Sequence, residues 1–301
     1  MVEYLLGNYL VEIGKITEEQ LTNVIAKQDQ TRVKMGLLAV AEEMMTAEEA
    51  DEVNRLQASM DKRYGDIAVE RGYLTAQQLD SLLKKQGNAY LSFAQSLVDE
   101  NLLKLSELEE MLDGYQKKNG YTKSDMEDLK SDDPDRIIPL FLPVEAMGWL
   151  EHIGIMVRTM IRCVDRHMYI GKAAVSNQLS VGEAAYQRFV SLTTPINGCK
   201  ELETGFTDVD GGMDDIVKAF YKLDYEMNAW DILGAAGEIL NCVDGLYVSA
   251  LSMKDIQCHL LPPIEMPAPS ELKEHTICSV PIYIGRKQAL FVIIGQGQEE
   301  S

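Results

Sequence analysis

The sequence has few basic residues for its length. Its 301 residues include 28 lysines and arginines against 48 aspartates and glutamates, so the formal net charge is −20 at pH 7. Nucleic acids and anionic membrane surfaces are bound through lysine and arginine side chains that neutralise phosphate. The charge balance therefore argues against both as bulk partners, although one local basic spot could still hold a small anion.

Long apolar runs and metal-binding patterns are also missing. No stretch reaches the roughly 18 apolar residues that a membrane-spanning helix needs, and the N-terminus lacks the basic and then apolar regions of a signal peptide. The five cysteines form no CxxC pair, and the four histidines form no HxH or HxxxH pattern. We therefore expect no structural zinc site. An odd number of widely spaced cysteines favours free, mostly buried thiols in a reducing cytoplasm.

The first third of the sequence repeats every 29 residues. Glycines stand at positions 7, 36 and 65, with Ala94 continuing the series, and valines at 11, 40, 69 and 98 keep the same interval. Each copy predicts two short helices, and Thr17 with Gln20 forms the capping-box pattern that starts the second helix of copy one. One helical hairpin cannot bury its apolar face alone. Stacking of four copies therefore predicts an all-α repeat module over residues 1–115.

The third copy carries a family resemblance. The segment Tyr64–Leu74, with Leu79 and Leu83, resembles the N-terminal domain of type II secretion and type IV pilus assembly ATPases. In some members that domain reads cyclic di-GMP with an arginine opening each of two motifs. Arg63 has this place in copy three, but Leu5 has it in copy one, and the acidic charge opposes a dianionic ligand. The repeats are therefore read first as a helical interaction or spacer module, and only second as a cyclic di-GMP site.

Residues 116–136 predict a charged linker, because the segment is polar and Pro134 interrupts any helix. The remaining residues, 137–301, predict a second domain of α+β class whose antiparallel sheet is covered by helices. Its expected elements, in order, are a long amphipathic helix from Pro143, strands at 167–176 and 185–194, an acidic loop at 198–215, a short helix at 214–223, a helix at 231–245, strands at 245–252 and 256–261, and a hairpin at 277–294.

The acidic loop opens like a calcium-binding loop at Asp208 and Asp210. The fifth and twelfth positions of such a loop, however, are Gly212 and Ala219, which offer no side-chain ligand. The sequence therefore predicts a solvated loop and no metal site.

Glu238 and Asn241 are three residues apart on a predicted helix, so both project from one face, and Asp231 lies on that face too. Three features resemble the CheC/CheX/FliY group of chemotaxis phosphatases: this pair, the Asn-x-x-x-Gly-Leu-Tyr-x-Ser passage that starts at Asn241, and the Pro262-Pro263 pair after the following hairpin. The resemblance is closest to the CheX type and spans roughly residues 139–296.

The resemblance implies a phosphatase that hydrolyses the aspartyl-phosphate of a response-regulator receiver such as CheY. Asn241 would orient the attacking water, and Glu238 would pair with the receiver's own lysine. The protein would need no cofactor and no metal ligand of its own, because the Mg²⁺ is expected on the receiver. The family also suggests a cytoplasmic location and a possible homodimer formed through sheet edges.

Two departures from the family pattern keep an alternative open. The acidic or seryl residue expected four positions before Glu238 is Gly234, for which Asp231 is a possible substitute. A second Glu-x-x-Asn site would fall on Glu151–Gly154, where glycine replaces the amide, so one site is expected. The alternative is a non-catalytic adaptor that binds the receiver, with the repeats as a protein-interaction module.

Overall fold

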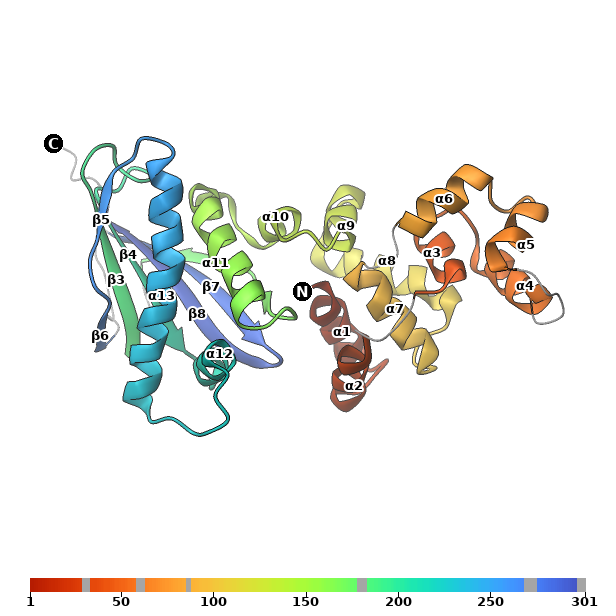
Figure 1. Ribbon diagram of the computed structural model, residues 1–301, viewed down its shortest axis with the longest axis horizontal. Helices are drawn as coiled ribbons and strands as arrows, with labels where there is room; N and C mark the ends of the chain where they lie inside the picture. The colour runs from red at the N-terminus through yellow and green to blue at the C-terminus, as the bar shows by residue number, and fades with distance from the viewer. Residues whose placement is uncertain (29–32, 58–62, 85–87, 178–182, 268–274, 297–301) are drawn as a thin grey trace. The chain divides into compact units, whose positions relative to one another are not determined.

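The computed structural model describes residues 1–28, 33–57, 63–84, 88–177, 183–267 and 275–296. The chain divides into two compact units, Val2–Asp133 and Pro134–Ser301 (Figure 1). In the described residues, the first unit is helical, and the second combines helices with an antiparallel sheet.

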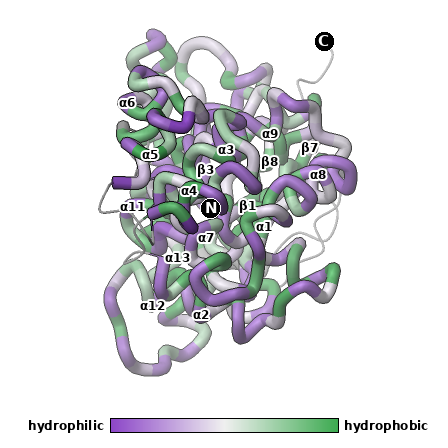
Figure 2. Tube along the Cα trace, turned by 90° about the vertical axis from the view of Figure 1, so that its right-hand side faces the viewer, coloured by the Kyte–Doolittle hydropathy of each residue, from purple (hydrophilic) through white to green (hydrophobic). Residues whose placement is uncertain are grey.

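Short helices build the first unit. Hydrophilic and hydrophobic residues alternate along them at short intervals (Figure 2), as expected of helices that each bury one face. Their bounds are α1 Val2–Glu12, α2 Glu18–Gln28, α3 Met35–Ala41, α4 Ala47–Gln57, α5 Tyr64–Glu70, α6 Ala76–Lys84, α7 Ala89–Asp99, the 3-10 helix η1 Leu105–Glu107, α8 Leu108–Asn119 and α9 Lys123–Lys130.

Equivalent turns recur in the first unit at the interval that the sequence shows. The side chains of Thr17, Thr46 and Thr75 each accept a hydrogen bond from the backbone N–H of the residue three positions later. The side chain of that later residue in turn accepts a hydrogen bond from the backbone N–H of the threonine. These capping boxes satisfy N–H groups that the first turn of a helix leaves unpaired. The residue that closes each preceding helix has a positive φ; the values are 71° at Gly14, 55° at Glu43, 79° at Gly72 and 56° at Asn101.

Two of the repeated glycines let neighbouring helices approach closely. A Cβ atom at Gly7 would lie 2.2 Å from Cδ1 of Leu21, and one at Gly65 would lie 2.6 Å from Cδ1 of Leu79. Both distances are far below van der Waals contact. Both glycines have ordinary helical backbone conformations, so their role here is packing: a Cβ atom at either position would force the facing leucine side chain to move.

Residues 116–136 are largely helical and mostly belong to the first unit, so the prediction of a charged linker is wrong. Helix α8 continues to Asn119, and α9 buries Met126 and Leu129 within the first unit. Thr122 begins α9 through reciprocal hydrogen bonds with Asp125. Composition misled because two well-placed apolar side chains are enough to attach a short helix to a core that other helices supply.

The second unit is a helix-covered antiparallel sheet, as the sequence predicts. Among the described residues the strand order is β1-β7-β8-β4-β3-β5, with β2 also pairing with β7 and β6 with β3. The strands are β1 Tyr169–Ile170, β2 Ala174–Ser176, β3 Glu183–Ser191, β4 Glu201–Asp208, β5 Cys258–Leu260, β6 Ile264–Pro267, β7 His275–Ile284 and β8 Lys287–Gln296. The helices are α10 Pro134–Ile137, η2 Ile138–Phe141, η3 Val144–Trp149, α11 Leu150–Cys163, α12 Gly212–Tyr221 and α13 Ala229–Ser252.

Helices α11 and α13 pack against each other and lie over the sheet (Figure 1). Successive residues of a strand point to opposite faces, and Ala185, Gln187 and Phe189 of β3 are on the face that meets these helices. Gln187 pairs across the sheet with Thr204 of β4. The face beneath α13 therefore contains two polar side chains among apolar ones. No described helix is long and apolar enough to cross a membrane.

Three of the predicted elements are wrong. Residues 245–252, expected as a strand, continue α13, and the expected loop at 198–215 contains strand β4. The helix expected from Pro143 begins as the 3-10 helix η3 and becomes α-helical only at Leu150. The hairpin formed by β7 and β8, the strand β5 and the short helix α12 confirm the prediction.

The five cysteines are free thiols, as predicted. The prediction that most of them are buried is wrong, because only Cys199 and Cys278 are buried, whereas Cys163 and Cys242 are exposed. The two exposed thiols belong to helices α11 and α13, whose outer faces meet solvent.

Candidate functional site

The two predicted site residues lie on α13, a helix of 24 residues. Asn228 begins this helix. Its side-chain oxygen accepts a hydrogen bond from the N–H of Asp231 over 3.0 Å, and its amide donates to the Asp231 carboxylate over 2.7 Å. The carboxylate of Asp231 is thus engaged at the start of the helix. Any role of Asp231 in place of the residue missing at Gly234 stays a prediction.

Glu238 and Asn241 are exposed on the outer side of α13, whereas Ile239, Leu240 and Val243 are buried against the rest of the unit. Residues three apart in a helix are neighbours on its surface. The structure therefore presents a carboxylate and a carboxamide side by side on one accessible helix face.

A buried glutamine holds the side chain of Asn241. The Nε2 group of Gln187, on β3, donates to Oδ1 of Asn241 over 2.8 Å and to the backbone oxygen of Leu261 over 2.9 Å. Gln187 is only 1% exposed, and its Oε1 atom has no hydrogen-bond partner in the described structure. One side chain thus connects α13, the sheet and the segment that follows β5.

The segment after β5 passes close to α13 next to the site. A Cβ atom at Gly237 would lie 3.1 Å from Cβ of Pro263, which is tighter than an ordinary contact. The backbone N–H of Leu261 also donates to the carbonyl of Arg188 on β3. The Pro262-Pro263 pair therefore keeps this segment against the helix turn that carries Glu238.

Two neighbouring groups show the electrostatic influence of Glu238. Burial, together with the negative charge of Glu238, raises the pKa of the Cys242 thiol and of the Tyr221 hydroxyl. A raised pKa keeps the thiol protonated and therefore weakly nucleophilic at neutral pH. Cys242 is consequently a poor candidate for covalent chemistry.

The carboxylate at the position of a second site, on α11, forms an exposed ion pair. The carboxylate of Glu151 lies 2.7 Å from Nζ of Lys254. Gly154, where a second amide would stand, is buried, and a Cβ atom there would lie 2.9 Å from Nη1 of Arg158. On α11 the carboxylate of Glu151 is thus paired, and Gly154 carries no amide; that the unit has a single site stays a prediction.

A buried polar cluster that the sequence did not reveal lies under α13. Nε2 of His152 lies 2.9 Å from Oδ1 of Asp244, and the hydroxyl of Thr204 donates to Oδ2 of Asp244 over 2.5 Å. The imidazole of His152 stacks on the ring of Tyr247, with centroids 3.9 Å apart. The available signal was a polar residue, Asp244, within an apolar helix stretch, but its partners are remote in the sequence.

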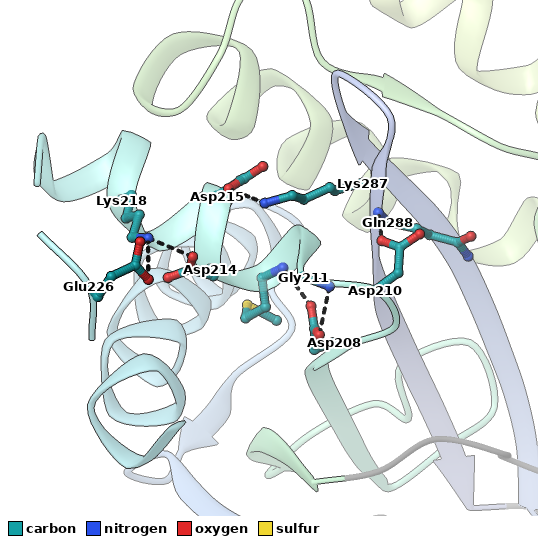
Figure 3. Close-up of polar contacts among 10 residues, drawn as sticks. Asp208, Asp210, Gly211, Asp214, Asp215, Lys218, Glu226, Lys287 and Gln288 are labelled. Atoms are coloured by element: carbon teal, nitrogen blue, oxygen red, sulfur yellow. Dashed lines mark hydrogen bonds and ion pairs between the residues drawn. The ribbon is translucent and has the colours of Figure 1, made fainter. Parts of the chain in front are cut away.

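The acidic residues before and within the first turn of α12 form hydrogen bonds and ion pairs inside the second unit. Figure 3 shows Asp208, whose carboxylate accepts hydrogen bonds from the backbone N–H groups of Gly211 and Met213, at 2.9 and 2.8 Å. Asp215 forms an ion pair with Lys287 over 2.9 Å. Asp208 thus stabilises the start of α12. Among the described residues, no group of three or more histidine, cysteine, aspartate or glutamate side chains could hold a metal ion.

Comparison with known proteins gave results at the level of structure alone. No protein-family model matches the chain, and no curated protein matches it. The resemblance of the N-terminal repeats to secretion and pilus ATPases is therefore unsupported.

Several solved structures of chemotaxis proteins are similar to the chain. A CheX from Desulfovibrio desulfuricans is 15% identical with a TM-score of 0.40, covering 48% of this chain and 97% of its own. A CheC-like protein from a Shewanella species is 14% identical with a TM-score of 0.42, covering 50% and 99%. A Borrelia burgdorferi complex of CheX with CheY, BeF3 and magnesium is 11% identical with a TM-score of 0.39, covering 49% and 96%. The structural neighbours are thus CheX- and CheC-like over about half of the chain.

Proposed function

We propose that the protein is a phosphatase that hydrolyses the aspartyl-phosphate of a CheY-like response-regulator receiver. The observation that carries this proposal is the presence of Glu238 and Asn241 side by side on the exposed face of α13, with the amide of Asn241 held by Gln187. A carboxylate and an orientated carboxamide on an open surface suit a macromolecular substrate that brings its own reactive group.

The proposed chemistry needs little more than positioning. An acyl phosphate is intrinsically reactive, so placing a water in line with the phosphorus atom supplies much of the catalysis. Asn241 holds that water, whose oxygen bonds to phosphorus while the bond between phosphorus and the aspartyl oxygen breaks. The products are the free aspartate carboxylate and dihydrogen phosphate, which keeps both water protons. The Mg²⁺ that neutralises the phosphoryl oxygens belongs to the receiver.

Glu238 and the exposed apolar side chains farther along α13 would bind the receiver. A carboxylate on the surface can pair with the lysine of the receiver active site. On α13, Trp230 is 66% and Leu246 is 44% exposed, and Met253 just beyond the helix is 88% exposed. Large exposed apolar and aromatic side chains are typical anchors of protein interfaces. Docking along α13 would therefore bring the phosphoryl group to Asn241.

The decisive experiment follows the decay of a phosphorylated receiver domain in the presence of this protein. We expect wild type to accelerate decay and Asn241→Ala to lose about a hundredfold or more of that acceleration. Asn54→Ala, the same substitution at an exposed residue of α4 in the helical unit, is the matched control and should retain wild-type activity. If wild type accelerates decay no more than Asn241→Ala does, the phosphatase function is wrong.

A second candidate function is a non-catalytic adaptor that binds the receiver. The specific feature in its favour is Gly234, where the family carries an acidic or seryl residue. Titration of the phosphorylated receiver separates the two functions. An adaptor would bind it with micromolar or better affinity and leave its decay unchanged, and Glu238→Ala would weaken that binding.

The helical unit would localise or regulate this activity. We propose that it is a module of four stacked helical hairpins within residues 1–115 that binds another protein, with the catalytic unit within 137–301 acting in the cytoplasm. The recurring capping boxes and left-handed turns support the repeat.

Cyclic di-GMP is the less favoured ligand of the helical unit. Calorimetry with tens of micromolar cyclic di-GMP should give no heat, and light scattering should show whether the protein forms the proposed homodimer.

A further inference from the structure

Gln187 is a polar side chain in an otherwise apolar position. It is 1% exposed on the helix-facing side of β3, and its Oε1 atom has no partner in the described structure. An unpaired buried oxygen costs about 1–3 kcal/mol relative to a paired one. The two hydrogen bonds that its Nε2 group donates contribute about 0.5–1.5 kcal/mol each, which is similar in size to this cost. The net gain in stability from a glutamine here is therefore small.

The two acceptors of Gln187 fix the orientation of both amides. The backbone oxygen of Leu261 can only accept a hydrogen bond, so the group of Gln187 that faces it must be the NH2 group. The same NH2 group faces Asn241, which must therefore turn its Oδ1 atom inward. The Nδ2 group of Asn241, which has no partner in the described structure, is left as the donor available to solvent.

We propose that Gln187 is a positioning residue of the site, and that it fixes the carboxamide of Asn241 so that an N–H donor faces the reacting water. This inference rests on the proposed phosphatase function. A water that accepts from Nδ2 keeps its second lone pair for phosphorus. Without Gln187, the amide of Asn241 rotates freely about its last side-chain bond, and the water loses its fixed position.

Two substitutions test this role in the full-length protein with a phosphorylated receiver domain as substrate. Gln187→Met keeps the length of the side chain and removes the donor. We expect it to lower kcat about 10- to 100-fold, with KM for the receiver within about twofold, because Glu238 and the docking surface are unchanged. Gln288→Met, the same substitution at a half-buried residue of β8, is the matched control and should leave both constants unchanged.

Gln187→Glu provides a signature that a merely structural residue would not give. The introduced carboxylate would face the carbonyl of Leu261 and draw Nδ2 of Asn241 inward, which removes the outward donor. Protonation of the carboxyl restores a donor toward these acceptors. We therefore expect kcat of this variant to be lowest at high pH and to recover partly as pH falls, relative to wild type at each pH.

The outcomes separate this inference from the function on which it rests. Loss of kcat at retained KM in Gln187→Met, with acid recovery in Gln187→Glu, supports the positioning role. If Asn241→Ala loses activity while both Gln187 variants keep wild-type kcat, the positioning role is overturned and the phosphatase stands. If wild type does not accelerate decay, the proposed function fails first and the inference with it. Should Gln187→Met fail to fold, Gln187→Glu alone decides.

Discussion

Asp244 is a carboxyl group enclosed on all sides by the second unit. It is 0% exposed, and its neighbours are the hydroxyl of Thr204 and the imidazole of His152. Burial raises the pKa of Asp244, and the hydrogen bonds from His152 and Thr204 offset part of this rise. A carboxyl whose pKa is raised by folding stabilises the native state while it is protonated, and this contribution is lost as pH rises through the folded-state pKa.

Asp244→Asn should therefore change how stability depends on pH. We expect the unfolding free energy of wild type, relative to the variant, to fall as pH rises above about 4, by at most about 1.4 kcal/mol per pH unit. Urea denaturation at several pH values between 4 and 7 measures this difference. Asp255→Asn, at an exposed residue of the same unit, should show wild-type behaviour. Equal pH dependence in wild type and Asp244→Asn would show that Asp244 has no raised pKa.

Four turns that follow helices in the first unit have a residue in the left-handed conformation, and these residues differ in how readily they adopt it. Gly14 and Gly72 occupy left-handed positions that glycine adopts at little cost, but Glu43 and Asn101 occupy equivalent ones. A left-handed conformation costs a residue with a Cβ atom about 1–2 kcal/mol, with asparagine affected less than others. The turn at Glu43 is therefore the least favourable of these four.

Glu43→Gly should stabilise the first unit by about 1 kcal/mol, and Gly72→Ala should destabilise it by a similar amount. The two substitutions are reciprocal tests of the left-handed position at two similar turns. Chemical denaturation followed by circular dichroism at helical wavelengths measures both. A loss of stability in Glu43→Gly would mean that the carboxylate makes a contribution greater than the backbone strain.

Among the helices and strands, the elements predicted correctly are those whose ends are determined by residues close together in the sequence. The hairpin of β7 and β8 was predictable because Gly285 marks its turn between two apolar runs. The end of α13 was misread because Gly245, Leu246 and Tyr247 have the composition of a strand. The deciding fact is that Tyr247 and Leu251 continue the buried face of the helix, and that face exists only because the sheet lies under it.

The same distinction applies to the site. That Glu238 and Asn241 lie on one helix face was predictable, because both belong to one short motif. Gln187 is 54 residues from Asn241, and His152 is 92 residues from Asp244. Nothing local distinguishes a strand glutamine that faces an amide from one that faces solvent. Such pairs are defined by strand register and helix packing, which a single sequence does not reveal.

The whole molecule consists of two units with their own buried cores. A fragment from Pro134 to Ser301 should therefore fold without the helical unit, because the sheet and its covering helices form contacts of their own. Well-dispersed amide signals in a proton–nitrogen spectrum would confirm this. We also expect the fragment to keep receiver dephosphorylation within about twofold of the full chain at saturating receiver. Poor dispersion would mean that the first unit completes the fold of the second.

The buried carboxyl of Asp244 has a consequence for geometry as well as stability. Apolar contacts tolerate a small roll of a helix about its long axis, whereas hydrogen bonds weaken steeply when they are bent. Thr204 and His152 hold Asp244 from two different elements, one turn beyond Asn241. The buried hydrogen bonds of Asp244 thus fix the rotation of α13 about its own axis, and with it the direction in which the outer residues of the helix point. Substitutions at Thr204 or His152 would misdirect Asn241 without touching it.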